Sequence, residues 1–171
     1  MLKPMSDLLL PDPRFETTFA QDAETGIIRP MQIADLHAAV QPFVLNSTVP
    51  SEVRWQFETA RNAFVYCWFC YELATLAEGY ALSALENGLR KRAEIENKVP
   101  RWPSLKRFLD LPSGEGWLDP GGFLMPFEAI VMARNHVQHG HPQLFHQFSL
   151  MMLEIVYQIL NALYPDVSAA L

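Results

Sequence analysis

The feature that most constrains this fold is a long stretch without proline. No proline occurs between Pro50 and Pro100, and apolar residues recur there every three to four positions. This spacing places apolar side chains along one face of a helix. About 46 helical residues would span about 69 Å at 1.5 Å per residue, which is long for a small domain. We therefore expect helix here, with a kink or break near Gly79 or Gly88.

Other segments have the same helical spacing. Phe123 to Ala133 is apolar and leads into a helix end, and Leu144 to Tyr164 has a continuous apolar stripe. Shorter helices are expected at Pro30 to Val40 and at Ser104 to Leu109, whereas no long stretch alternates with a period of two. The predicted class is all-α, an antiparallel helical bundle of about four main helices with short extra helices.

The chain divides into two parts by its patterning. Residues 1–50 contain several prolines and scattered acids, so we expect an irregular N-terminal arm followed by a short helix. Residues 51–171 are predicted to form the helical bundle, with a loop at Leu111 to Gly122. A chain of 171 residues fits a single domain, and it can bury roughly 70% of its unfolded surface.

Charge limits the classes of partner. The formal net charge of −6 argues against a protein that binds nucleic acid over its whole surface. The segment from Glu86 to Arg107 is an exception: seven basic and three acidic residues give +4, which leaves −10 for the remainder. It is interpreted either as the solvated end of a helix or as a local patch that faces phosphate.

The N-terminus and the cysteines point to the cytoplasm. The Leu8 to Leu10 run is too short for the apolar region of a secretion signal, and no apolar stretch reaches the roughly 18 residues of a membrane span. Cys67 and Cys70 form no disulfide framework. Because they lie in the most apolar helical segment, both are expected to pack in the core. We therefore expect a cytoplasmic protein without a membrane partner.

One motif carries the candidate chemistry. Residues 134–141 read RNHVQHGH. Arg134 lies where the helical pattern calls for an apolar residue, because it continues the stripe formed by Phe127, Ile130 and Val131. A charged guanidinium on such a stripe must be paired, or must face a cleft or a partner chain.

Helical geometry restricts how the motif residues can meet. At about 100° per residue, Asn135 and His139 lie on one face, whereas Arg134 and His139 are offset by roughly 140°. Arg134 and His139 can meet if the helix unwinds near Gln138, if the arginine wraps round the helix, or if a second copy supplies one of them. A stop at Gly140 favours the first arrangement, and a symmetric dimer provides the third.

A metal site is not predicted from the nearby histidines. The adjacent Arg134 would repel a divalent ion, and no carboxylate occurs from Arg134 to Phe148. We expect no metal and no cofactor. The histidines in question are His136, His139, His141 and His146.

The pattern Arg-x4-His, with asparagine directly after the arginine, in an all-helical domain resembles the HEPN superfamily (higher eukaryotes and prokaryotes nucleotide-binding). The resemblance covers Ser51 to Tyr164 in architecture, but its sequence signature is limited to residues 134–139. It implies a small helical homodimer that binds RNA. Many members are metal-independent ribonucleases of toxin–antitoxin, phage-defence or RNA-processing systems, so it also implies a possible cognate antitoxin.

The resemblance assigns a role to each motif residue. Arg134 would hold the phosphate with its planar fork of donors. His139 would move protons, because histidine is the side chain that ordinarily titrates near neutral pH, and Asn135 would orient the imidazole or a phosphate oxygen. The sequence leaves the carboxylate partner of the arginine open among Glu72, Glu78 and Glu86.

A protein of another class fits the same residues. In a catalytically inactive helical binding or scaffold module, Arg134 would form a structural ion pair and His139 would cap the bundle. The two hypotheses differ in stability, because removing one partner of a buried ion pair costs roughly 3–5 kcal/mol. Removing a catalytic arginine that lies at an open cleft would reduce the stability only slightly.

Overall fold

The computed structural model describes residues 3–22, 25–101, 103–118, 122–123, 125–140 and 145–165. This part of the chain is mostly helical, which confirms the predicted all-α class in its coarse form. Its two short strands, β1 (Phe19–Gln21) and β2 (Ile28–Pro30), pair antiparallel with Phe19 opposite Pro30. The described helices are α1 (Ile33–Val40), α2 (Ser51–Tyr66), α3 (Leu73–Ile95), α4 (Leu105–Gly114), α5 (Phe127–Gln138) and α6 (His146–Leu163).

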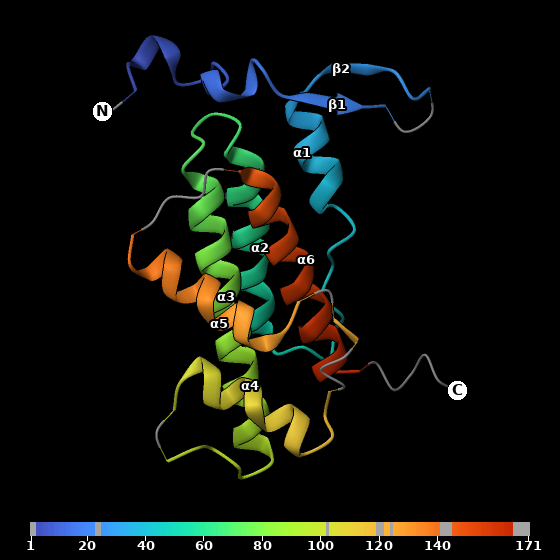
Figure 1. Ribbon diagram of the computed structural model, residues 1–171, viewed down its shortest axis with the longest axis vertical. Helices are drawn as coiled ribbons and strands as arrows, with labels where there is room; N and C mark the ends of the chain where they lie inside the picture. The colour runs from blue at the N-terminus through green and yellow to red at the C-terminus, as the bar shows by residue number, and fades with distance from the viewer. Residues whose placement is uncertain are drawn as a thin grey trace.

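Helix α3 lies at the centre of the packing, in contact with both α2 and α6 (Figure 1). A Cβ added at Gly88 would lie 2.5 Å from Leu160 Cδ2, so the absence of a side chain allows α6 to approach closely there. The buried Tyr164 hydroxyl donates a hydrogen bond of 2.7 Å to the Gly88 carbonyl oxygen. Small residues on α3 therefore permit the tight packing on which the core depends.

The break in the long proline-free stretch does not lie at the predicted glycines. Gly79 and Gly88 both lie inside α3, and the chain leaves the helical conformation at 67–72 instead. This segment is rich in cysteine and aromatic residues, which are poorer helix formers than alanine or leucine. The prediction of a kink at glycine was wrong, because the glycines serve helix packing.

The N-terminal segment holds this break in place, and Figure 1 shows it lying across one end of the helices, away from α4. The Asp12 amide donates to the Trp68 carbonyl oxygen at 2.7 Å, and the Asp12 carboxylate accepts the Tyr71 amide at 3.2 Å. Phe15 is buried, and its ring centroid lies 5.1 Å from that of Trp68. Residues far apart in the sequence thus satisfy the backbone groups that the break leaves without helical partners.

Three smaller expectations also need correction. Helix α4 continues through Pro112 to Gly114, because Phe108 and Pro112 are both buried and packing overrides the break expected at proline. The N-terminal arm, predicted to be irregular, contains the β1–β2 hairpin. Cys70 is exposed on the turn before α3, while Cys67 is buried as expected.

His146 is buried in the core with a hydrogen-bonding neighbour. Its side chain lies between Phe15 and Tyr71, and the Tyr71 hydroxyl oxygen is 3.4 Å from Nδ1. The same oxygen accepts the His146 amide at 2.9 Å. Burial lowers the pKa of the His146 imidazole below its ordinary value of 6.5.

We expect this burial to make stability fall in mild acid. Below about pH 6.5 the unfolded chain binds a proton at His146 that the folded chain does not, so the free energy of unfolding decreases as pH falls, by at most about 1.4 kcal/mol per pH unit. Urea denaturation between about pH 5 and about pH 8, the interval in which histidine ordinarily titrates, measures the slope. His146→Phe should flatten it, and the exposed His37→Phe should not. Equal slopes in all three proteins would contradict the prediction.

In the described part of the chain, no helix is long and apolar enough to cross a membrane.

Candidate functional site

Helix α5 carries the motif and packs on α3 and α4. Phe127, Ile130 and Ala133 are buried on its inner face. A Cβ at Gly79 would lie 3.0 Å from Val137 Cγ1, so α5 comes close to α3 at this point. Gly140 has φ +77°, in the left-handed region that favours glycine, and it confirms the predicted end of the helix.

Arg134 lies on the flank of α5 that faces α3. Its Nη2 is 3.5 Å from Glu86 Oε2, and its side chain is 30% exposed. Glu86 is therefore the partner among the three candidate carboxylates. Glu72 contacts Arg14 instead, at 2.7 Å, and Glu78 is buried in the core, where it accepts the Ser149 hydroxyl at 3.2 Å.

Glu86 is shared between two arginines on different helices. Its Oε1 lies 3.6 Å from Arg90 Nη2, one turn along α3, while its Oε2 faces Arg134 on α5. Both distances exceed those of close, charge-assisted hydrogen bonds. Two guanidiniums against one carboxylate leave a net charge of +1 at this point (2 − 1). The arginine that the sequence placed on an apolar stripe is loosely paired and open to solvent.

Asn135 and His139 lie at the exposed end of α5. The helical conformation continues through Gln138, so α5 does not unwind before His139, which follows as the C-terminal cap. In the described structure no side-chain hydrogen bond joins any two of Arg134, Asn135 and His139, although the His139 amide donates to the Asn135 carbonyl oxygen at 2.9 Å as part of the helix end. The His139 imidazole has no hydrogen-bonding partner there. The motif residues are thus accessible, but one chain does not assemble them.

An apolar groove runs along another face of α5. Its volume is about 400 Å³, and Met132 beside it is 72% exposed. His139 follows Met132 by seven residues, which places both on one side of the helix. His136 lines the groove, and the exposed His139 lies one helical turn beyond it. The groove is lined by Met125, Ala129, Met132, Ala133, His136 and Phe148.

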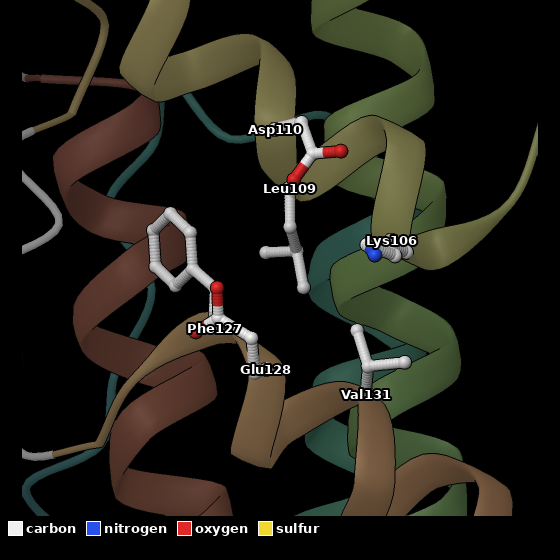
Figure 2. Close-up of a pocket in the computed structure, with 6 residues that line it drawn as sticks. All are labelled: Lys106, Leu109, Asp110, Phe127, Glu128 and Val131. Carbon is white, nitrogen blue, oxygen red and sulfur yellow. The ribbon is translucent and has the colours of Figure 1, made fainter.

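A separate pocket of about 200 Å³ lies between α4 and the beginning of α5 (Figure 2). Leu109, Phe127 and Val131 provide its apolar wall, and its polar residues are Lys106, Asp110 and Glu128. None of Arg134, Asn135 and His139 lines this pocket. Its last lining residue on α5, Val131, lies one helical turn before Arg134, so the pocket is next to the arginine and away from His139.

The basic segment predicted between Glu86 and Arg107 is largely neutralised. Four of its seven cations lie beside carboxylates, so the segment is not a uniform phosphate-facing patch. The pairs are Arg90 with Glu86 at 3.6 Å, Lys91 with Glu52 at 2.5 Å, Arg92 with Glu96 at 2.9 Å, and Lys98 with Glu115.

The positions and burial of the histidine and cysteine side chains in the described ranges bear on metal binding and thiol chemistry. In the ranges that the structure describes, no three histidine, cysteine or acidic side chains are placed to hold a metal ion. His141 lies outside those ranges. Burial raises the pKa of the Cys67 thiol to about 12, which keeps it protonated and unreactive near neutral pH.

Sequence reasoning missed the polar groove next to Arg134. The groove lies between α2 and α3 and has a volume of about 380 Å³. The available signal was the spacing of Ser83, Asn87 and Arg90, which puts three polar side chains on one face of an otherwise apolar helix. Its lining residues are Gln56, Ser83, Glu86, Asn87 and Arg90.

Comparison with known proteins adds no family or relative. No protein-family model matches the chain, and neither a curated protein nor a solved structure does. The functional assignment therefore rests on the residues of the motif and on their surroundings.

Proposed function

We propose that this chain is a HEPN-like RNA-binding protein and a metal-independent endoribonuclease of a toxin–antitoxin or defence system. The observation that carries the proposal is the state of Arg134. Its guanidinium is partly exposed and held at 3.5 Å by a carboxylate that also contacts Arg90. A phosphate can displace such a partner, whereas a guanidinium enclosed by close ion pairs would be unavailable. The antiparallel bundle of the HEPN type and a cytoplasmic location belong to the same proposal.

The chemistry is cleavage of an RNA phosphodiester by its own ribose. His139 accepts the proton of a 2′-hydroxyl, the 2′-oxygen attacks phosphorus, and the bond from phosphorus to the 5′-oxygen breaks. The protonated His139 imidazole gives this proton to the leaving 5′-oxygen, so the products are a 2′,3′-cyclic phosphate and a 5′-hydroxyl, and His139 returns to its neutral form. Arg134 stabilises the charge that develops on the phosphoryl oxygens, and Asn135 orients the imidazole or a phosphate oxygen.

The proposed active protein is a homodimer. Arg134 faces α3 while His139 is exposed on another side of α5, so a second copy must bring an imidazole to the arginine. The apolar groove lined by Met132 supports this arrangement, because exposed apolar surface on α5 favours association at the motif helix. In a system with an antitoxin, that protein would compete for the same surface.

A cleavage assay in the presence of EDTA tests the proposal. We expect the purified protein to cut single-stranded RNA without a metal and to leave termini that carry a 2′,3′-cyclic phosphate. The matched substrate is 2′-O-methyl RNA of the same sequence, which lacks the attacking hydroxyl and should stay intact. Cleavage of both substrates, or of neither, would contradict the proposed reaction.

The Arg134–Glu86 pair also favours the second candidate, a catalytically inactive binding module. Thermal and urea denaturation of Arg134→Ala separate the two. We expect a loss below about 1 kcal/mol, because the pair is long and partly exposed. Arg90→Ala is the matched control, since Arg90 contacts the other oxygen of the same carboxylate. A loss of about 3–5 kcal/mol for Arg134 alone would identify a structural pair.

A further inference from the structure

The polar groove between α2 and α3 has an aromatic pair at one end. Trp55 is 64% exposed, and its ring centroid lies 6.5 Å from that of Tyr80 in an edge-on arrangement. Trp55 precedes Gln56, a groove residue, and Tyr80 lies one turn before Ser83, another. The exposed indole of Trp55, next to a lining residue of the polar groove, is therefore available to stack on a flat ligand.

The other end of the groove is cationic. Tyr80, Ser83, Asn87 and Arg90 follow one face of α3 over ten residues, or about 15 Å. Arg90 and Arg134 both contact Glu86 at this end. Aromatic and cationic groups therefore lie along one continuous line, with side-chain amides and a hydroxyl between them.

The middle of the groove offers groups that both donate and accept hydrogen bonds. Asn87 Nδ2 donates to Gln56 Oε1 at 3.1 Å, which joins α2 to α3. The remaining amide groups can donate and accept, and the exposed Ser83 hydroxyl, which donates to the Gly79 carbonyl oxygen at 2.9 Å, can accept. Base edges require partners of this kind. Stacking platforms combined with a charged groove are the general means by which proteins bind single-stranded nucleic acid.

We propose that this groove binds single-stranded RNA, with a base stacked on Trp55 and a backbone phosphate between Arg90 and Arg134. The inference rests on the proposed function and names the substrate path into its site. In the free protein Glu86 occupies the phosphate position between the two guanidiniums. Binding exchanges this carboxylate for the phosphate, so Glu86 opposes binding.

An acidic protein segment is the competing occupant. Its carboxylates would use the two arginines beside Glu86 just as an RNA phosphate would, so charge does not separate the two occupants. An acidic segment, however, makes no specific use of an exposed indole or of paired side-chain amides. The observed combination therefore favours nucleic acid over an acidic peptide.

Binding of a fluorescent, single-stranded 2′-O-methyl oligonucleotide tests the inference without cleavage. We expect Trp55→Ala to weaken binding about 10-fold, the loss of one stacked base. Arg90→Gln should also weaken binding, whereas Glu86→Gln should tighten it several-fold. Tyr66→Ala is the matched control, because Tyr66 is exposed on the same helix about 16 Å away and should leave affinity unchanged. Circular dichroism verifies that each variant is folded.

The outcomes separate this inference from the proposed nuclease. Binding that follows the expected pattern supports the groove even if ordinary RNA is never cut, in which case only the nuclease fails. No binding by the wild-type protein, or equal losses in Trp55→Ala and Tyr66→Ala, overturns the groove. Competition by a polyglutamate peptide as effective as that by RNA also overturns it and identifies an acidic protein partner.

Discussion

Replacing His139 by alanine is expected to lower RNA cleavage by about 10²–10⁴-fold, the range for loss of a general acid–base group. Arg134→Ala should lower it by about 10²–10³-fold, as for loss of a preorganised charge at the transition state. Because His139 is exposed and makes no side-chain hydrogen bond in the described structure, its loss should leave the melting temperature unchanged. His37→Ala, at an exposed position on α1, is the control.

Mixing the two inactive variants distinguishes a site built within one chain from a site built between two. If Arg134 of one chain acts with His139 of its partner, half of the randomly formed dimers are mixed, and each has one intact site. Refolding Arg134→Ala and His139→Ala together should then restore about a quarter of the wild-type activity. Mixed dimers without activity would contradict a shared site and would place both residues in one chain.

Loss of the Asp12 carboxylate is expected to have the largest effect on stability. Arg14 beside it and the amides of Arg14 and Tyr71 lower the Asp12 pKa from 3.8 to about 2. A shift of this size corresponds to about 2–3 kcal/mol in favour of the folded state at neutral pH. Asp12→Ala should reduce the free energy of unfolding by that amount, measured by urea denaturation.

The pH dependence of the Asp12 effect provides its internal check. Because the folded-state pKa is depressed, the contribution is complete above about pH 3.8 and is lost as pH falls through about 2. The difference in free energy of unfolding between the wild type and Asp12→Ala should therefore narrow as the pH falls from 3.8 to about 2. Asp7→Ala is the control, because this half-buried carboxylate in the same segment accepts a hydrogen bond only from the neighbouring Ser6 hydroxyl among the described contacts, and its loss should change stability by less than about 0.5 kcal/mol. A difference that persists undiminished in acid would mean that packing, not charge, is involved.

Local sequence signals predicted the helical class and the C-terminal end of α5. Gly140 marked the stop because only a left-handed residue closes the helix there, and the spacing of apolar residues located α6. The turn at 67–72 could not be predicted from local signals, since it depends on Asp12 and Phe15 more than fifty positions earlier. Glycines inside α3 gave a misleading signal for the same reason: their role is set by Val137 and Leu160.

The residues of the candidate site could be predicted from the sequence, but the side chains that surround them in the fold could not. The anomaly of Arg134 on an apolar stripe was visible in the sequence, and Glu86 was among the three carboxylates named for it. Nothing local selects Glu86, because the choice depends on how α5 lies along α3. The groove that contains Arg90 and Gln56 arises from the pairing of two helices, so only the three-dimensional arrangement reveals it.

The bridge from Asp12 to the turn before α3 has a practical consequence for preparing the protein. A shortened chain that begins at α1 would lose the carboxylate that caps this turn and the Phe15 ring that fills the space beside Trp68. In such a fragment, the turn that precedes α3, the helix that carries Glu86, would lose the groups that hold it. Affinity tags and cleavage sites are therefore better placed at the C-terminus, so that inactivity in an assay reports on the site and not on an uncapped fold.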